Sequence, residues 1–348
     1  MKILVLGGTW FLGKAVVEEA LGRGWEVTTF SRGLSGEAVA GARAVHGDRT
    51  VAADLLRLAG KGPWDAVVDT SASELAPRDV LAGARALEAS AGGYVYVSTV
   101  SAYRGWPDKP LTEVSEVLDG PPDADGSYGR MPEGAEGPDL HYGRQKAGAE
   151  RAVLTTFGDA RTTVLRPGVI LGPGEYVGRL PWWLGRAARG GRLLAPGRAD
   201  KTIQPVDVRD VAGFALDRAP ASTASSGAGG VFNVTAPIGR ETMGGFLASC
   251  LEVTRSDGEL VWAPDEVLVR HRVRQWTELP LWRTHPGAWQ IDSRGAYAAG
   301  LTCRPLAETV KDTWQRLSGG GQPVDHPRWA KHGIPAAREA EILAALGS

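Results

Sequence analysis

The chain has 348 residues, of which 43% are hydrophobic, and its formal net charge is -1 at pH 7. This length suffices for one large α/β unit with a second lobe, and the hydrophobic fraction can fill their cores. The 39 basic residues are balanced by 40 acidic ones, so the chain has no general attraction for nucleic acid. Its two cysteines, Cys250 and Cys303, are too few for a disulfide scaffold and indicate a reducing compartment.

No apolar run reaches the ~18 residues that a membrane span requires. The first residues lead directly into a predicted strand, with no signal-peptide pattern ahead of it. The six histidines show no zinc-ligand grouping. We therefore expect a soluble, cytoplasmic protein without a metal.

The first predicted element is the apolar run at residues 1–6, which is typical of a strand buried on both faces. It passes into a glycine-rich turn, Gly7-Gly8-Thr9-Trp10-Phe11-Leu12-Gly13. A helical pattern follows, and residues 27–30 form a second strand. Glycines let a backbone approach a pyrophosphate, and the helix N-terminus would face that anion. The order of these elements favours a phosphate-binding loop over an ordinary turn.

Further apolar runs predict four more strands, with helical patterns between most of them, at residues 66–69, 94–97, 163–165 and 231–234. Strands that alternate with helices imply a parallel sheet covered on both faces. The fold class is therefore α/β, a doubly wound, Rossmann-like parallel sheet with a smaller α/β substrate-binding lobe. The low-complexity segment 219–230 is expected to be a flexible surface connection.

The pattern also predicts the domain organisation. Residues 1–168 and 203–235 form the dinucleotide-binding domain, and residues 169–202 and 236–330 form the substrate lobe, with the active site between them. Residues 331–348 are left as a C-terminal tail.

Tyr142 and Lys146 stand four residues apart in a predicted helix, so both side chains project from one face. An ammonium group near a phenol stabilises the tyrosinate and draws the pKa of the tyrosine down from about 10. Tyr142 could then transfer a proton to or from a substrate oxygen. The same spacing also arises by chance on surface helices, so its weight comes from the glycine-rich turn that precedes it.

With these features the chain resembles an extended short-chain dehydrogenase/reductase of the NAD-dependent epimerase/dehydratase family, from residue 1 to about residue 315. The family's glycine motif is G-x-x-G-x-x-G, in which Gly7 and Gly13 match while Trp10 stands at the middle glycine. In this departure the chain resembles a branch with G-G-T-x-F-x-G, which includes plastid RNA-associated relatives. The resemblance implies a cofactor-binding loop made of Gly7, Thr9, Trp10, Phe11, Leu12 and Gly13.

The resemblance also implies a catalytic triad of Thr99, Tyr142 and Lys146, with Ser98 as the alternative hydroxyl. Thr99 would hydrogen-bond the substrate oxygen, Tyr142 would transfer its proton, and Lys146 would also bind the nicotinamide ribose. Residues 165–173 resemble the family's R-P-G segment beside the nicotinamide, and residues 204–212 resemble its return to the sheet. The implied cofactor contacts in the first of these segments are Pro167, Gly168 and Val169.

Cofactor choice depends on the residues after the second strand, where an acidic side chain would bind a ribose 2′-hydroxyl. Here Ser31 and Arg32 suit a 2′-phosphate, so NADP(H) is favoured over NAD(H), although Arg32 could be a solvated loop cation. Asp48 resembles the residue that contacts the adenine amine, and a turn residue is the alternative. Thr70 and Ser71 follow the strand at residues 66–69, where it should meet the cofactor.

Two charged segments give opposite indications about the substrate. Residues 108–139 hold nine acidic side chains and could attract a cationic substrate or be a solvated loop. Residues 270–274 carry three arginines and could bind a sugar-nucleotide phosphate or be a cationic strand edge. Eight of the 12 tryptophans fall in the expected substrate lobe, where most should fill the core and one or two line a pocket. The substrate-contact candidates are Ser101, Trp182, Trp183 and Gln204.

Related sugar dehydratases and decarboxylases carry an acidic residue shortly after the catalytic Thr, where this chain has Val100 and Ser101. The sequence therefore does not favour an elimination reaction, and hydride transfer remains as the expected reaction. We expect an NADPH-dependent oxidoreductase that reduces a ketone or aldehyde of a small sugar-like or specialised-metabolite substrate. The alternatives are an NAD-dependent nucleotide-sugar epimerase and, from another class, an RNA-binding or redox-sensing protein. The sequence leaves open whether the protein forms a homodimer.

Overall fold

The computed structural model describes residues 1–34, 36–133, 139–221, 229–321 and 331–347. The chain divides into two units. The first comprises Met1–Gly168, Val208–Val234 and Asp292–Thr302, and the second comprises Val169–Asp207, Thr235–Ile291 and Cys303–Ser348.

A seven-stranded sheet forms the centre of the first unit, in the order β11-β6-β5-β4-β1-β2-β3, and every strand pair is parallel. The strands are β1 (Lys2–Leu6), β2 (Glu26–Ser31), β3 (Arg43–His46), β4 (Ala66–Asp69), β5 (Tyr94–Val97), β6 (Thr162–Pro167) and β11 (Gly230–Val234). From Ile3 to Leu6 the side chains of β1 are at most 1% exposed, as expected for a strand covered on both faces.

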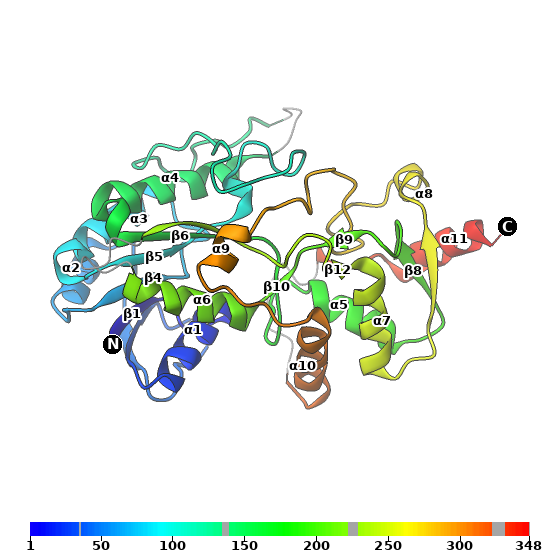
Figure 1. The fold of residues 1–348 in the computed structure, drawn as a ribbon, viewed down its shortest axis with the longest axis horizontal. Coiled ribbons are helices and arrows are strands. Elements are labelled where there is room, and N and C mark those ends of the chain that lie inside the picture. The colour runs from blue at the N-terminus through cyan, green and yellow to red at the C-terminus, as the bar shows by residue number, and fades with distance from the viewer. Residues whose placement is uncertain (35, 134–138, 222–228, 322–330, 348) are drawn as a thin grey trace. The chain divides into compact units, whose positions relative to one another are not determined.

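Helices cover both faces of this sheet, with α3 and α4 on one and α1 and α6 on the other (Figure 1). The α-helices of the unit are α1 (Phe11–Gly22), α2 (Ala52–Ala59), α3 (Pro77–Leu87), α4 (His141–Phe157), α6 (Val208–Ala221) and α9 (Arg294–Ala298). Short 3₁₀ turns occur at η1 (Glu88–Ser90), η2 (Val100–Ala102) and η3 (Asp159–Arg161). This arrangement confirms the predicted Rossmann-like fold.

Strand β3 was not predicted from the sequence. It lies at the edge of the sheet, and of its four residues only Val45 is buried. An edge strand with one buried side chain lacks the continuous apolar run that marks the central strands.

Within its described residues, the second unit combines helices with three two-stranded sheets, β7 with β10, β9 with β12 and β8 with β13. Its strands are β7 (Ile170–Leu171), β8 (Arg192–Pro196), β9 (Thr202–Ile203), β10 (Val206–Asp207), β12 (Glu241–Thr242) and β13 (Glu259–Ala263). Its helices are α5 (Arg179–Ala188), α7 (Met243–Thr254), α8 (Asp265–Arg270), α10 (Leu306–Ser318) and α11 (Ala336–Leu346).

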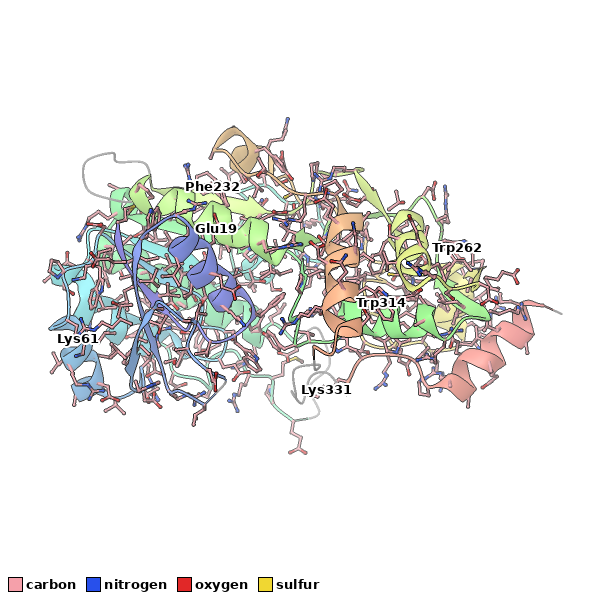
Figure 2. All side chains as sticks on the ribbon, turned by 90° about the horizontal axis from the view of Figure 1, so that it is seen from below. Glu19, Lys61, Phe232, Trp262, Trp314 and Lys331 are labelled. Carbon is pink, nitrogen blue, oxygen red and sulfur yellow. The ribbon has the colours of Figure 1, made fainter. Side chains whose placement is uncertain are left out.

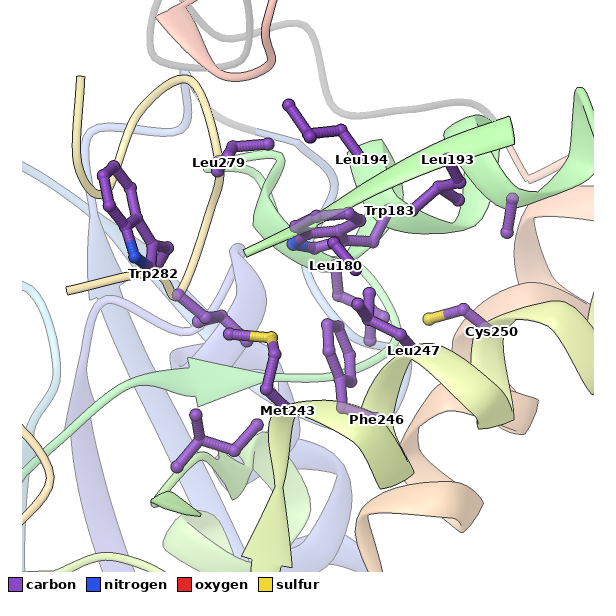
Figure 3. Packing of buried hydrophobic residues seen from close by; sticks show 14 of the residues in the cluster. Leu180, Trp183, Leu193, Leu194, Met243, Phe246, Leu247, Cys250, Leu279 and Trp282 are labelled. Atoms are coloured by element: carbon purple, nitrogen blue, oxygen red, sulfur yellow. The ribbon is translucent and has the colours of Figure 1, made fainter. Parts of the chain in front are cut away.

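Aromatic and aliphatic side chains form the core of the second unit. Figure 3 shows Trp183 and Phe246 at its centre, with ring centroids 6.4 Å apart. Trp262 and Trp314, labelled in Figure 2, pack against the same cluster while remaining partly exposed. These tryptophans therefore contribute to packing, as expected for most tryptophans of this lobe.

The observed division differs in detail from the predicted one. Residues 203–207 belong to the second unit, and residues 292–302 return to the first. The expected C-terminal tail contains α11, which packs within the second unit. Of the predicted surface connection 219–230, residues 222–228 lie outside the described part of the chain. Within the described residues, no helix has the length and hydropathy to cross a bilayer.

Candidate active site

The predicted site residues of the first unit gather at the carboxyl edge of its sheet. Gly7, Thr70 and Thr99 lie just beyond the ends of β1, β4 and β5, and Ser31 is the last residue of β2. The strand order reverses between β1 and β4, so this edge has a switch point where α/β folds bind ligands.

The glycine-rich turn has the geometry of a phosphate loop. Gly7 and Gly8 have φ values of 106° and 103°, in the left-handed region that favours glycine. A Cβ atom on Gly13 would lie 2.6 Å from the Gly8 nitrogen and 2.7 Å from Thr70 Oγ1. The start of α1 therefore packs closely against the turn, as in a phosphate loop, and the residues present fit a dinucleotide.

Trp10 departs from the glycine motif without backbone strain. It precedes α1 with φ -134° and ψ 141°, an extended conformation that any L-residue adopts, and it provides no side-chain cap. The positive φ values of the turn fall on Gly7 and Gly8 before it and on Phe11 after it, where φ is 29°. This explains how the middle glycine of the motif can be replaced.

We predict that Gly13→Ala weakens dinucleotide binding by about ten-fold or more, since overpacking against fixed backbone costs on the order of 1–3 kcal/mol. Gly22→Ala is the matched control, because it lies on the same helix and its Cβ would meet no atom within 4 Å. Fluorescence titration of both variants checks this. Equal affinities would contradict the close packing at Gly13.

The two candidate hydroxyls after β5 have different partners. Thr99 is 9% exposed, and its Oγ1 accepts a hydrogen bond of 3.1 Å from the Ser101 nitrogen. The Ser98 hydroxyl instead donates to the buried carboxylate of Glu150. The Ser98 hydroxyl is therefore engaged by Glu150, whereas Thr99 caps the turn η2 that follows it.

Helix α4 carries the other two members of the predicted triad. The Lys146 side chain is buried, and its Nζ donates to the Tyr96 hydroxyl at 2.7 Å and to the Val97 carbonyl at 2.8 Å. Tyr142, one helical turn earlier, is 42% exposed. The lysine is thus fixed against β5 while the phenol lies where a substrate can reach it.

Gly143, which sequence reasoning missed, lets this helix approach the segment that follows Thr99. A Cβ atom on Gly143 would lie 2.2 Å from the Ser101 carbonyl oxygen, so another residue would push α4 away from η2. Ala102 and Ala147 pack at the same contact. Small residues on both elements therefore bring the helix of Tyr142 close to Thr99.

Burial lowers the pKa of Lys146 from 10.5 to about 8, while the carboxylates of Asp69 and Glu150 act in the opposite direction. The unfolded chain keeps this proton up to a higher pH than the folded protein. Folding is therefore penalised at pH 7, and the penalty fades as the pH rises from about 8 to 10.5.

Lys146→Met should therefore stabilise the cofactor-free protein at pH 7 by about 1–3 kcal/mol, with the lost hydrogen bonds offsetting part of the gain. The gain should disappear towards pH 10.5, the ordinary pKa of the lysine. Urea denaturation of both proteins across this pH range measures it. A loss of stability at pH 7 would contradict the prediction.

A buried ion pair between Arg49 and Asp69 lies beside the predicted adenosine contacts and was not predicted. The guanidinium binds both carboxylate oxygens, at 2.8 and 2.7 Å, and also donates to Ser71 Oγ at 2.9 Å. The Tyr94 hydroxyl donates to the same carboxylate at 2.7 Å. Arg49 thus joins the loop after β3 to the loop after β4. An Asp that ends an apolar strand is the signal that could have revealed it.

A second buried pair connects α4 with β6. Glu150 and Arg166 are 2% and 4% exposed, and their closest atoms are 2.6 Å apart. The guanidinium of Arg166 also lies over the ring of Tyr103, 4.5 Å from its centre. The sequence signal was Glu150 four residues after Lys146, on the same helix face.

The residues expected to select the cofactor follow β2 and β3. Ser31 Oγ accepts from the Gly33 nitrogen at 3.3 Å, and Arg32 is exposed. Hydrogen bonds from the Thr50 nitrogen and hydroxyl lower the pKa of Asp48, and the charge of Arg32 adds to this. Asp48 therefore forms a turn in this structure, which is the alternative role considered from the sequence.

The predicted nicotinamide segment lies where the chain first passes from the first unit into the second. Pro167 is the last residue of β6, Gly168 closes the first unit, and Val169 begins the second. The Gly168 nitrogen donates to the Val234 carbonyl at 3.2 Å, which ties the segment to β11.

In the second unit two substrate candidates have the surroundings of core residues. Trp183 is fully buried, and its indole nitrogen donates to the Pro280 carbonyl at 2.8 Å. Gln204 is also fully buried, and its amide bonds the backbone of Ala236 and Ile291. Trp182 is partly exposed and packs edge-on against Trp183.

The two charged segments also have partners within the chain. In the acidic segment, Asp119 accepts from the Tyr128 hydroxyl at 2.6 Å and pairs with Arg144 at 3.3 Å. Residues 134–138 of that segment lie outside the described residues. The arginines at residues 270–274 occupy the end of α8 and the following turn rather than a strand edge, and Arg274 pairs with Glu278.

A glycine turn at the switch point, with Thr, Tyr and Lys from β5 and α4 nearby, defines an NAD(P)-dependent enzyme of the short-chain dehydrogenase/reductase type. The model of the NAD dependent epimerase/dehydratase family matches residues 3–235. The chain belongs to this family, as the sequence motifs indicated.

Solved structures share this fold. UDP-glucose 4-epimerase from Thermotoga maritima, with UDP-glucose, has a TM-score of 0.66 and 20% identity, over 92% of this chain and 100% of that chain. The Bordetella bronchiseptica enzyme WbmG, in complex with NAD, has a TM-score of 0.66 and 18% identity, over 92% and 95%. A dTDP-4-dehydrorhamnose reductase from Clostridium acetobutylicum has a TM-score of 0.62 and 16% identity, over 91% and 100%. A search of curated proteins gave no match.

Proposed function

We propose that the protein is an NADPH-dependent reductase of a ketone or aldehyde on a small sugar-like or specialised-metabolite substrate. The observation that carries the proposal is the position of Lys146, fixed to the end of β5 two residues before Thr99, with the exposed Tyr142 one turn away on α4. This set of groups can orient a carbonyl oxygen and protonate it.

NADPH, when bound, supplies the hydride for this reduction. Thr99 donates a hydrogen bond to the carbonyl oxygen and orients it. Tyr142 transfers its phenolic proton to that oxygen as negative charge develops there. Lys146 favours the resulting tyrosinate through its positive charge.

The preference for NADPH rests on the end of β2. Ser31 and Arg32 stand where an acidic residue would bind the ribose 2′-hydroxyl, and the exposed guanidinium of Arg32 can pair with a 2′-phosphate. Arg32→Ala should therefore reduce affinity for NADPH more than for NADH.

A nucleotide-sugar epimerase is the second candidate, supported by the similarity to UDP-glucose 4-epimerase and by a second similar structure, a UDP-N-acetylglucosamine 4-epimerase. An epimerase oxidises and re-reduces one carbon, so it consumes no cofactor overall. It would be expected to retain NAD through purification.

Titration of the purified protein with NADPH and NADH, together with identification of any dinucleotide released on denaturation, separates these candidates. Selective and reversible binding of NADPH supports the reductase. Tightly retained NAD supports the epimerase. Binding of neither dinucleotide would contradict both proposals.

A further inference from the structure

Strand β5 carries two buried tyrosines whose hydroxyls have different partners. Tyr94 and Tyr96 are both fully buried, and as alternate residues of one strand they point to the same face of the sheet. The Tyr94 hydroxyl donates to Asp69, whereas the Tyr96 hydroxyl accepts from Lys146 Nζ at 2.7 Å. One phenol thus belongs to the Arg49–Asp69 pair and the other to the proposed catalytic lysine.

We propose that Tyr96 is a positioning residue that holds the Lys146 ammonium group in its charged form and fixed orientation. This inference rests on the proposed function of the same site. An ammonium group has three N–H donors, and the Tyr96 hydroxyl and the Val97 carbonyl accept two of them. One N–H of Lys146 therefore remains for a ligand at the carboxyl edge of the sheet. The two interior acceptors fix the direction in which this N–H points.

The surroundings of Lys146 make this hydroxyl important. The ammonium is buried against β5, so it has little solvent to replace a lost acceptor. The charged and titratable groups facing it are Asp69 from β4, Glu150 on its own helix and Arg49 after β3. Tyr142 lies one turn away on the same helix. Burial raises the pKa of Tyr96, and the charge of Tyr142 adds to this increase. Both carboxylates favour the ammonium form, whereas Arg49 opposes it.

Tyr96→Phe removes the hydroxyl and keeps the ring, whose centre lies 4.3 Å from Nζ. Loss of an acceptor disfavours the charged form, so the pKa of Lys146 should fall. A hydrogen bond to a charged group corresponds to about one pH unit or more. Tyr94→Phe is the matched control, because it removes the neighbouring buried hydroxyl, which donates to Asp69 instead of accepting from Lys146.

The test follows the ¹³Cε resonances of the chain's eight lysines through a pH titration of the cofactor-free protein, with Lys146→Arg identifying the signal. We expect the midpoint of Lys146 to fall by about one pH unit in Tyr96→Phe. It should stay within about 0.3 unit of the wild-type value in Tyr94→Phe. An unchanged midpoint in Tyr96→Phe, or equal shifts in both variants, would overturn the proposal.

A second measurement needs no Tyr96 variant and covers the case in which Tyr96→Phe does not fold. With tyrosines labelled at Cζ, the Tyr96 signal should shift at the pH at which Lys146 titrates, and this step should vanish in Lys146→Met. A Tyr96 signal insensitive to that titration would overturn the proposal. Neither measurement uses turnover or cofactor, so failure of the reductase proposal would appear separately, in the dinucleotide titration.

Discussion

Tyr142→Phe is expected to lower kcat for carbonyl reduction by about 10²- to 10⁴-fold, the usual contribution of a general acid. The substitution removes only the phenolic hydroxyl of a half-exposed side chain, so the fold should be retained. Affinity for NADPH should change little, because the remaining cofactor contacts are intact. Steady-state kinetics with a responsive carbonyl substrate, together with the dinucleotide titration, measure both effects.

Tyr128→Phe is the matched control for this prediction. Tyr128 belongs to the acidic segment before α4, and its hydroxyl donates to Asp119. Its loss should leave kcat within about two-fold of the wild-type value, since surface substitutions usually have small effects. If Tyr142→Phe turned over substrate as fast as this control, Tyr142 could not be the acid.

Glu150→Gln is expected to cost about 3–5 kcal/mol of the free energy of unfolding, the largest stability effect that we predict. It leaves the buried charge of Arg166 without a carboxylate and replaces one of the two acceptor oxygens, shared by Arg166 and the Ser98 hydroxyl, with an NH₂ group. Because Glu150 anchors α4 to β6, the variant should also lose activity beyond its loss of stability. Urea denaturation and kinetics at low temperature measure the two losses.

Two controls show whether burial causes this effect. Glu88→Gln breaks the more exposed pair with Arg161, and it should cost less than about 1 kcal/mol. Replacing both partners, as Glu150→Leu with Arg166→Met, should recover most of the stability, because no unpaired buried charge remains. A single variant no less stable than Glu88→Gln would contradict the importance of the buried pair.

The features that the sequence predicted are those determined by neighbouring residues. The apolar run of β1 followed by glycines predicted the strand and turn, and the spacing of Tyr142 and Lys146 predicted their common helix face. Backbone conformation and side-chain periodicity depend on a few adjacent residues, so a single sequence is enough to predict them. Family membership followed from the same local motifs.

The tertiary structure decided which of these residues work together and which only pack. Arg49 binds Asp69, and Glu150 binds Arg166. These partners are 20 and 16 residues apart in the sequence, and no local pattern indicates that they pair. The same holds for Tyr96 and Lys146, which are 50 residues apart and whose contact depends on how closely α4 approaches β5. Sequence alone determined the class of chemistry. The pairing of buried charges required the fold, because their partners are selected by the packing of elements distant in the chain.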